Sequence, residues 1–168
     1  KRMNLLLVND DGIKAQGIHE LAEALSSEAS IYVCAPDGQR SASGHGITVS
    51  TYIAVQEEKF NCAEYAFSTS GTPADCVKLG MKLFERQGVK IDMVFSGINH
   101  GGNLGTDTLY SGTVSAAIEG SLCGVPSVAV SVNSHKAKHF EYACYLAKGA
   151  LNKAYGKLPP EVVFNINT

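Results

Sequence analysis

The fold is decided by Leu5-Leu6-Leu7-Val8-Asn9-Asp10-Asp11-Gly12-Ile13, in which an apolar run ends abruptly in two adjacent carboxylates and a glycine. The apolar run has the length of a buried strand. In a parallel α/β sheet ligands bind beyond the carboxyl ends of the strands, so Asp10 and Asp11 are expected in that crevice. Neighbouring carboxylates repel each other unless a cation or a set of donors neutralises them. The pair therefore predicts ligands for a hard divalent metal.

A helix is expected after the two carboxylates, because apolar residues recur there at the spacing of a helix that lies on a sheet. These residues are Ile18, Leu21, Ala22 and Leu25. Residues 31–35 then have the composition of a second strand. Strand, helix and strand in this order predict a βαβ unit with a right-handed crossover, in which the two strands are parallel neighbours.

The next part of the chain is less regular. Residues 36–46 are polar and rich in Gly and Ser, which predicts a loop that leaves the carboxyl end of the second strand. Residues 47–55 and 63–69 alternate polar and apolar side chains, which suggests extended segments such as a hairpin outside the parallel core. Thr72-Pro73-Ala74-Asp75 predicts a helix start with a capping box and a proline at the first helical position. The buried stripe of this helix is expected at Val77, Met81 and Phe84.

Strands and helices continue to alternate in the second half. Residues 93–95 predict a strand, and the glycine-dense residues 96–105 predict a loop that lets the backbone approach a ligand closely. A helix is expected from Ser111, with Val114, Ala117, Ile118 and Leu122 facing inward. A strand at 128–132, a helix at 140–154 and a strand at 162–166 complete one domain over residues 1–168. The predicted fold is α/β and Rossmann-like, with three layers in which helices flank a mostly parallel sheet.

Composition excludes several classes of protein. The formal net charge of -2, from 14 Lys and Arg against 16 Asp and Glu, provides no basic field for a nucleic-acid polymer. No apolar stretch approaches the roughly 18 residues of a membrane span, and the N-terminus lacks the apolar segment of a signal peptide. The five cysteines form no CxxC pair and lie mostly in apolar segments, so we expect buried free thiols and a cytoplasmic location.

Three predicted loops bring oxygen ligands or small residues to the same edge of the sheet, namely residues 9–11, 39–45 and 96–103. Carboxylate, hydroxyl and amide oxygens suit Mg²⁺, Mn²⁺ or Ca²⁺ rather than zinc. The helix that starts near Ser111 offers unpaired N–H groups and a partial positive charge, which is a plausible phosphate seat. A metal on one side and these N–H groups on the other would stabilise charge on a phosphoryl group. The pattern favours metal-dependent hydrolysis of a phosphate ester.

Other interpretations of the same residues remain open at this level. Asp10-Asp11-Gly12 is also the composition of a turn with a helix cap. Ser41 or Ser43 with His45 suggests a hydroxyl nucleophile and its base, although the Gly-x-Ser-x-Gly elbow is absent. Tyr110 is placed either to stack on a nucleobase or to pack against protein.

Five segments together resemble the survival protein E (SurE) family of metal-dependent nucleotidases, and they occur in the family's order across nearly the whole chain. They are residues 8–13, residues 35–37 together with 40–45, Gly71-Thr72-Pro73-Ala74-Asp75-Cys76-Val77, Ser96-Gly97-Ile98-Asn99 and Ser111-Gly112-Thr113-Val114. The resemblance implies a phosphoric monoester hydrolase that releases phosphate from nucleoside 5′- (and 3′-) monophosphates. Two other functions are alternatives to the nucleotidase. One is a broad acid phosphatase or exopolyphosphatase, and the other, from a different class, is a non-catalytic nucleotide or metal sensor.

The resemblance also implies the site, with one divalent ion per subunit, Mg²⁺ or Mn²⁺, and Ca²⁺ in crystals. The implied metal ligands are Asp10, Asp11, Ser41 and Asn99, and the implied catalytic residues are Asp10, Asp11 and Asn9. The implied phosphate-binding residues are Ser43, Gly44, Asn99, Asn103, Ser111, Gly112 and Thr113. Family members usually form homodimers or homotetramers through a C-terminal extension. This sequence ends at Asn165-Ile166-Asn167-Thr168, so we expect a single domain that lacks the extension.

Overall fold

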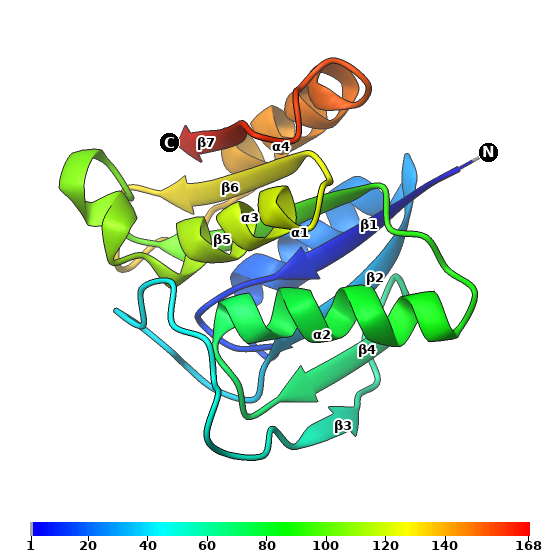
Figure 1. The fold of residues 1–168 in the computed structure, drawn as a ribbon. Helices are drawn as coiled ribbons and strands as arrows, with labels where there is room; N and C mark the ends of the chain where they lie inside the picture. Colours follow the sequence, from blue (N-terminus) through cyan, green and yellow to red (C-terminus); the bar gives the residue numbers. More distant parts are fainter. Residues whose placement is uncertain (1) are drawn as a thin grey trace.

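Among the described residues, seven strands form a single sheet in the order β3-β4-β2-β1-β5-β6-β7 (Figure 1). The computed structural model describes residues 2–168. The strands are β1 (Met3–Val8), β2 (Ala29–Pro36), β3 (Val55–Glu57), β4 (Ala63–Thr69), β5 (Met93–His100), β6 (Ser127–Val132) and β7 (Val163–Asn167). The helices are α1 (Gln16–Ser26), α2 (Pro73–Arg86), α3 (Gly112–Leu122) and α4 (Glu141–Ala154), with a short 3₁₀ helix η1 (Gly105–Leu109). All neighbouring strands are parallel except β3 and β4, which confirms the α/β class.

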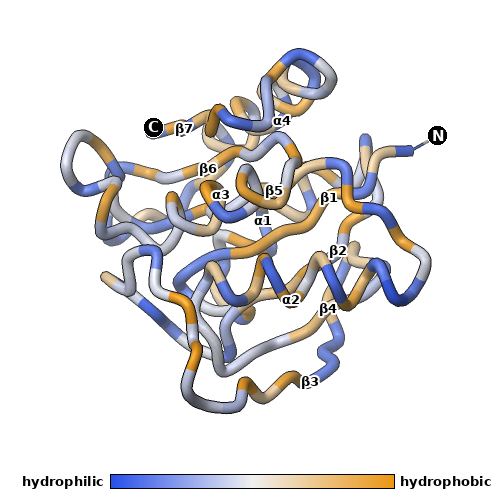
Figure 2. Tube along the Cα trace, in the orientation of Figure 1, coloured by the Kyte–Doolittle hydropathy of each residue, from blue (hydrophilic) through white to orange (hydrophobic). Residues whose placement is uncertain are grey.

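Strand β1 lies at the centre of the sheet and is buried on both faces. Leu5 and Leu7 pack in the layer that contains α1 and α4, whereas Leu6 and Val8 pack in the layer that contains α2. This explains why β1 is a continuous apolar run rather than an alternating one, as its hydropathy colouring in Figure 2 shows. The two helical layers and the sheet make the three layers that the sequence predicts.

The helices follow their sequence signals closely. The apolar stripe of α1 is fully buried, and α4 buries Ala143, Ala147 and Leu151 on its inner face. The predicted capping box of α2 is present, because the Asp75 backbone N–H donates to Thr72 Oγ1 at 3.1 Å and the Thr72 N–H donates to Asp75 Oδ2 at 2.9 Å. Two orphan donors at the start of α2 are thus satisfied.

The expected hairpin outside the parallel core is wrong in part. Residues 63–69 form β4, which pairs in parallel with β2 inside the sheet. Only Val55–Glu57 pairs antiparallel, as the short edge strand β3. An alternating pattern indicates a strand with one well-buried face, and it does not distinguish a parallel from an antiparallel partner.

The predicted loop at 96–105 begins later than expected, because β5 continues to His100. Its register with β6 shifts between Ser96 and Asn99, and the Gly97–Ile98 peptide bond is cis. Gly97 has φ of 143°, and a Cβ there would overlap the carbonyl oxygen of Val130. The glycine therefore marks an irregularity inside a strand rather than the end of the strand.

Two smaller expectations about burial are also wrong. Ile118 and Leu122 on α3 are 36% and 72% exposed, because α3 contacts the sheet through its small residues. All five cysteines are free, but Cys62 and Cys123 are exposed, unlike the buried Cys34 and Cys76. No helix among residues 2–168 combines the length and the apolar composition needed to cross a lipid bilayer.

Candidate functional site

The segments that follow β1, β2, β5 and β6 meet at one edge of the sheet, on the left of Figure 1. They surround a cleft of about 510 Å³. Its lining comes from these segments and from η1, and consists of Asp10, Asp11, Gln39, Ser41, Ala42, Asn99, His100, Gly101, Gly102, Asn103, Asp107, Tyr110, Ser111 and His135. All four residues predicted as metal ligands lie in this lining. Parallel strand ends therefore bring together residues that are far apart in the sequence, such as Asp11 and His100, which are separated by 89 positions.

Asp10 is the most deeply placed of the carboxylates that line the cleft, with only 6% of the residue exposed. Its Oδ1 accepts a hydrogen bond from Thr113 Oγ1 at 2.8 Å. Burial raises the pKa of Asp10 from an ordinary 3.8 to about 6, the neighbouring charge of Asp11 adds to the rise, and the Thr113 hydrogen bond opposes it. A carboxylate with a raised pKa in a cleft is a typical functional group.

Asp11 lies beside Asp10 but is closer to solvent. Its Oδ2 is 3.4 Å from the backbone nitrogen and 3.5 Å from Nδ1 of His100. These are long contacts, and they leave most of the carboxylate's acceptor capacity available. The Nε2 atom of His100 lies 3.3 Å from the carbonyl oxygen of Ala137, so the ring joins Asp11 to the segment after β6.

Asn99 and Ser41 supply neutral oxygens to the same cleft. The Nδ2 of Asn99 donates to the Gly101 carbonyl at 2.7 Å, which fixes the orientation of the amide. The amide oxygen of Asn99 has no hydrogen-bond partner in the described part of the chain. Ser41 Oγ accepts from Gln39 Nε2 at 2.9 Å and is exposed. Two carboxylates, an amide oxygen and a hydroxyl are ligands that hard cations prefer.

The N-terminus of α3 forms another wall of the cleft. Ser111 caps the helix, since its Oγ accepts from the Val114 N–H at 3.1 Å. A Cβ on Gly112 would lie 2.8 Å from Cβ of Asp10, so only glycine leaves room for the carboxylate there. The Asp10 carboxylate thus occupies part of the helix terminus that the sequence predicts as a phosphate seat.

Asn103 fastens the glycine-rich segment to the end of the sheet. Its Nδ2 donates to Ser131 Oγ at 2.9 Å, and its backbone N–H donates to Asn167 Oδ1 at 2.7 Å. Its carbonyl accepts from Asn165 Nδ2 at 2.8 Å. Asn103 therefore lines the cleft while hydrogen bonds to residues of β6 and β7 hold it in place.

Five of the predicted site residues are not part of the lining. Asn9 is fully buried. Its Nδ2 donates to the Gly12 carbonyl at 2.8 Å and its Oδ1 accepts from the Gly12 N–H at 3.2 Å, so it shapes the turn that presents Asp10 and Asp11. Gly112 and Thr113 lie directly behind Asp10. The Gly44 N–H donates to the Tyr110 carbonyl at 3.1 Å. The Oγ of Ser43 is buried without a partner among the described residues.

Asp107 and His135 line the cleft although sequence reasoning did not select them. Asp107 is on η1, a helical turn that no periodic signal predicts. His135 follows the carboxyl end of β6, so the rule that led to the other loops could have found it. Gln39, from the predicted loop after the second strand, and Tyr110, predicted to stack on a base or to pack against protein, also line the cleft.

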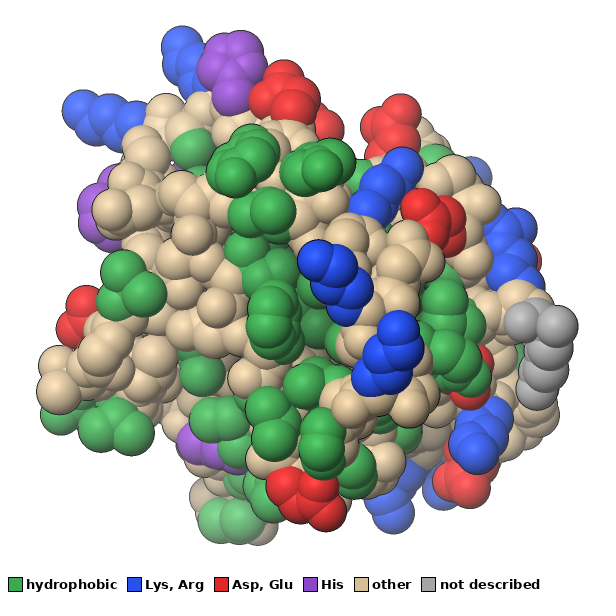
Figure 3. All heavy atoms as spheres, turned by 90° about the horizontal axis from the view of Figure 1, so that it is seen from above, with side chains coloured by type: hydrophobic (Ala, Val, Ile, Leu, Met, Phe, Trp, Pro, Cys, Tyr) green, Lys and Arg blue, Asp and Glu red, His purple; other side chains and the backbone are tan. Residues whose placement is uncertain are grey.

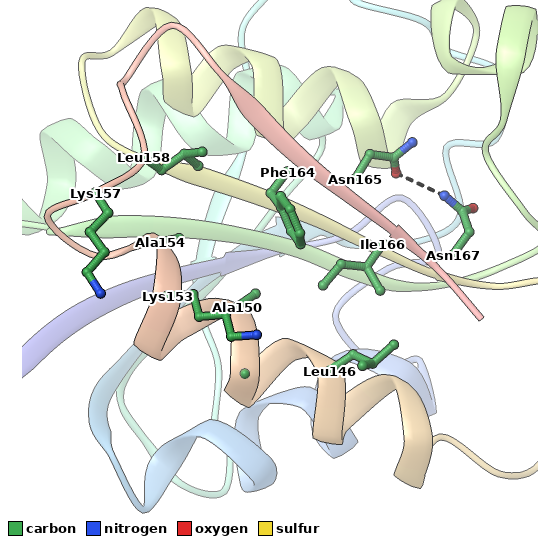
Figure 4. Close-up of a pocket in the computed structure, with 11 residues that line it drawn as sticks. Leu146, Ala150, Lys153, Ala154, Lys157, Leu158, Phe164, Asn165, Ile166 and Asn167 are labelled. Atoms are coloured by element: carbon green, nitrogen blue, oxygen red, sulfur yellow. Dashed lines mark hydrogen bonds between the residues drawn. The ribbon is translucent and has the colours of Figure 1, made fainter.

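A second cavity of about 500 Å³ lies between α4 and β7 (Figure 4). Apolar side chains dominate it, including Leu146, Leu158, Phe164 and Ile166, and Lys153 and Lys157 lie at its margin. The described residues that line it include no acid, histidine or cysteine. Its two lysines are accompanied by no carboxylate, imidazole or thiol, so the cleft at Asp10 is the candidate active site. Within residues 2–168, no group of three or more His, Cys, Asp and Glu side chains is placed to hold a metal ion. The predicted ligand set is of a different kind, because it combines two carboxylates with the oxygens of Ser41 and Asn99.

Comparisons with known proteins point to one family. The family model described as Survival protein SurE matches residues 5–168. A Clostridium botulinum (strain Loch Maree / Type A3) protein named 5′-nucleotidase SurE is 48% identical over 168 residues, covering 98% of this chain and 66% of that protein. The protein of the same name from Pelotomaculum thermopropionicum is 45% identical over 166 residues, covering 98% and 63%.

A solved structure agrees with this. The crystal structure of the SurE protein from Aquifex aeolicus superimposes with a TM-score of 0.84 at 39% sequence identity, and covers 98% of this chain and 66% of that one. The chain thus spans somewhat less than two thirds of the length of the relatives that it matches.

Proposed function

The chain belongs to the survival protein SurE family, and from that premise we propose that it is a divalent-metal-dependent phosphohydrolase that releases phosphate from nucleoside 5′- and 3′-monophosphates. The observation that carries the proposal is the cleft itself. It brings two carboxylates, Asp10 and Asp11, together with the neutral oxygens of Ser41 and Asn99 beside the start of a helix. The relatives' name, 5′-nucleotidase SurE, supports the substrate class.

The residues present fit a hard cation. Asp10 and Asp11 would hold it with Ser41 and Asn99, and the unpartnered amide oxygen of Asn99 is a ready ligand. The raised pKa of Asp10 supports the fit, because a buried carboxylate beside another one favours any partner that neutralises it. When bound, Mg²⁺ or Mn²⁺ supplies Lewis-acid stabilisation of the phosphoryl oxygens and a more acidic water.

The chain's own residues perform the remaining steps. One carboxylate of the Asp10–Asp11 pair orients the water that attacks phosphorus in line with the leaving oxygen and takes a proton from it. The leaving oxygen takes up a proton from solvent as its bond to phosphorus breaks, and the carboxylate later returns its own proton to solvent. Asn103 and Ser111, which line the cleft beside the start of α3, bind the phosphoryl oxygens, and the partial positive charge of the helix terminus favours the anion there. Asn9 does not line the cleft, and its role is to hold the turn that presents both carboxylates. No covalent phosphoryl-enzyme forms in this mechanism.

Metal removal tests the proposal directly. We expect EDTA to abolish phosphate release from AMP and GMP, and added Mg²⁺ or Mn²⁺ to restore it. Release that EDTA leaves unchanged contradicts the metal-dependent mechanism. A folded chain that binds Mn²⁺ but releases no phosphate from any substrate contradicts the hydrolase and favours a metal or nucleotide sensor.

The same metal centre also suits a broad phosphatase or exopolyphosphatase, since selectivity for nucleotides must come from groups around the phosphoryl site. Tyr110 is 66% exposed at the margin of the cleft and provides a surface on which a base can stack. Parallel rates for AMP, tripolyphosphate and p-nitrophenyl phosphate separate the two functions. We expect AMP to be preferred, and equal rates on all three would favour the broad phosphatase.

We also propose a homodimer or homotetramer and a cytoplasmic location. Exposed apolar side chains gather on the α4 and β7 side of the molecule (Figure 3), where the stacked rings of Tyr142 and Tyr145 are 65% and 69% exposed. Such a patch is typical of a protein contact, and here a second copy is the partner. The free thiols support a reducing compartment.

Light scattering during size exclusion measures the oligomeric state. We expect the mass of two or four copies, and a smaller mass for Tyr145→Lys, because a charge on this surface opposes apolar contact. A single-copy mass for the unaltered chain contradicts the oligomer. An unchanged assembly in the variant would place the contact elsewhere.

A further inference from the structure

A cluster of charged side chains lies outside the cleft and joins three elements. Glu119 on α3 is only 3% exposed. Its Oε2 is 2.7 Å from Nε2 of His45, and its Oε1 is 3.1 Å from Nζ of Lys78 on α2. Burying a carboxylate is unfavourable unless both oxygens find partners. Here one partner belongs to a helix and the other to the loop after β2.

The loop that carries His45 also carries Ser41, which lines the cleft. Its backbone is attached at Arg40, whose N–H donates to the Asp10 carbonyl at 2.7 Å, and at Gly44. Ser41 and Ala42 are exposed, and Ala42 has φ of 54°, an unusual conformation for a residue with a side chain. Over residues 41–46, all of them described, His45 is the one residue whose own side chain bonds another element. The loop has one more tie, because the Gly46 carbonyl accepts a hydrogen bond from Thr72 Oγ1 at the start of α2, at 2.6 Å.

The bond between Lys78 and Glu119 does not involve His45, so a change at His45 can be tested without disturbing the contact between the two helices. Helices α2 and α3 remain joined by that bond and by apolar packing of Cys76 and Val77 with Ala116. Losing the His45 side chain therefore removes the bond between the loop and α3 without separating the helices, while the bonds at Arg40, Gly44 and Gly46 remain.

We propose that His45 is a positioning residue that fixes the Ser41 loop against Glu119. It thereby sets the distance between Ser41 and the carboxylates of Asp10 and Asp11, which lie beside the start of α3. Glu119 lies on the same helix as Gly112 and Thr113, which back Asp10. The inference rests on the proposed function, since the purpose of the placement is a metal site that includes Ser41.

The test uses His45→Ala, His45→Gln and His139→Ala in the full chain. Gln places an amide N–H near the position of Nε2 and should rescue. His139 is a matched control, because it also faces a glutamate, Glu141 at 3.4 Å, but is 86% exposed. If His45→Ala does not fold, His45→Asn replaces it, since the shorter amide does not reach Glu119.

Two measurements are needed, and neither depends on turnover. Hydrogen exchange in EDTA reports the order of residues 39–46, and calorimetry with Mn²⁺ reports metal affinity. For His45→Ala we expect faster exchange in this loop and about tenfold weaker Mn²⁺ binding, with thermal unfolding close to that of the parent. We expect His45→Gln to recover most of both, and His139→Ala to change neither.

Unchanged exchange at residues 39–46 in His45→Ala overturns the proposal, and so does an equal effect of His139→Ala. Faster exchange with unchanged Mn²⁺ affinity also overturns it, because the loop would then be anchored without positioning a ligand. If the parent chain binds Mn²⁺ but hydrolyses no phosphate ester, the proposed function fails while these measurements still decide the role of His45.

Discussion

Asp10→Asn should lower metal-dependent phosphate release by about a thousandfold or more, and should at the same time stabilise the chain in EDTA at neutral pH. The loss of activity follows because an amide removes one of the two negative charges that balance the cation. Metal stabilisation of a phosphoryl group contributes several kcal/mol, and about 4 kcal/mol corresponds to a thousandfold in rate.

The gain in stability follows from the sign of the pKa shift. Burial, together with the charge of Asp11, raises the pKa of Asp10 from 3.8 to about 6, so the folded chain binds the proton more tightly than the unfolded chain does. The stabilising contribution is complete below about pH 4 and is lost as pH rises through about 6. The shift corresponds to about 3 kcal/mol at neutral pH. An asparagine is neutral throughout and avoids this loss.

Thermal unfolding in EDTA between pH 4 and pH 8 measures the effect. We expect the parent and Asp10→Asn to converge near pH 4 and to separate above pH 6, with the variant more stable. Glu85→Gln, at an exposed position on α2, is the control and should change neither stability nor activity. An active Asp10→Asn, or one that is less stable than the parent at pH 8, contradicts the role assigned to Asp10.

Gly112→Ala should lower kcat/KM by about a hundredfold. The added methyl would lie 2.8 Å from Cβ and 3.1 Å from Oδ2 of Asp10, and 3.1 Å from Cγ of Pro73. The first distance is shorter than van der Waals contact, so the carboxylate or the helix must move. A displacement of about 1 Å at a reacting centre costs about a hundredfold in rate. Overpacking also destabilises, here by about 1–3 kcal/mol.

Gly149→Ala is the matched control, since it adds the same methyl inside helix α4 with no atom within 4 Å. It should preserve kcat/KM and stabilise the chain by about 0.5–1 kcal/mol, because alanine favours the helix. Steady-state kinetics and thermal unfolding of both variants give the comparison. A Gly112→Ala variant with the parent's kcat/KM contradicts the tight arrangement at the start of α3.

Much of the fold was predictable from local signals that agree with one another. The run Leu5–Val8 is apolar on both faces because β1 is central, and Thr72 with Asp75 marks the start of α2 by a capping box that the structure contains. Asp10 and Asp11 were predictable as a pair for the same reason, since they directly follow a recognisable strand. The partners of β4 were not predictable, because strand pairing depends on residues that are distant in the chain. Strand β4 pairs antiparallel with β3 and parallel with β2.

The candidate site was predictable as a set of loops but not in its internal contacts. Strand order places the loops together, whereas the contact of Thr113 with Asp10 depends on how α3 packs. Asp107 and the Glu119–His45 pair carry no sequence signal, since a single acid on a helix is usually solvated. Their roles appear only when three elements meet.

A crystal structure of the chain with Mn²⁺, examined by anomalous diffraction, tests the central claim most directly. The account predicts an anomalous peak in the cleft, bound by oxygens of Asp10, Asp11, Asn99 and Ser41 at about 2.0–2.3 Å. A peak that lacks both carboxylates, or a cleft without a peak in crystals grown at saturating Mn²⁺, would contradict it.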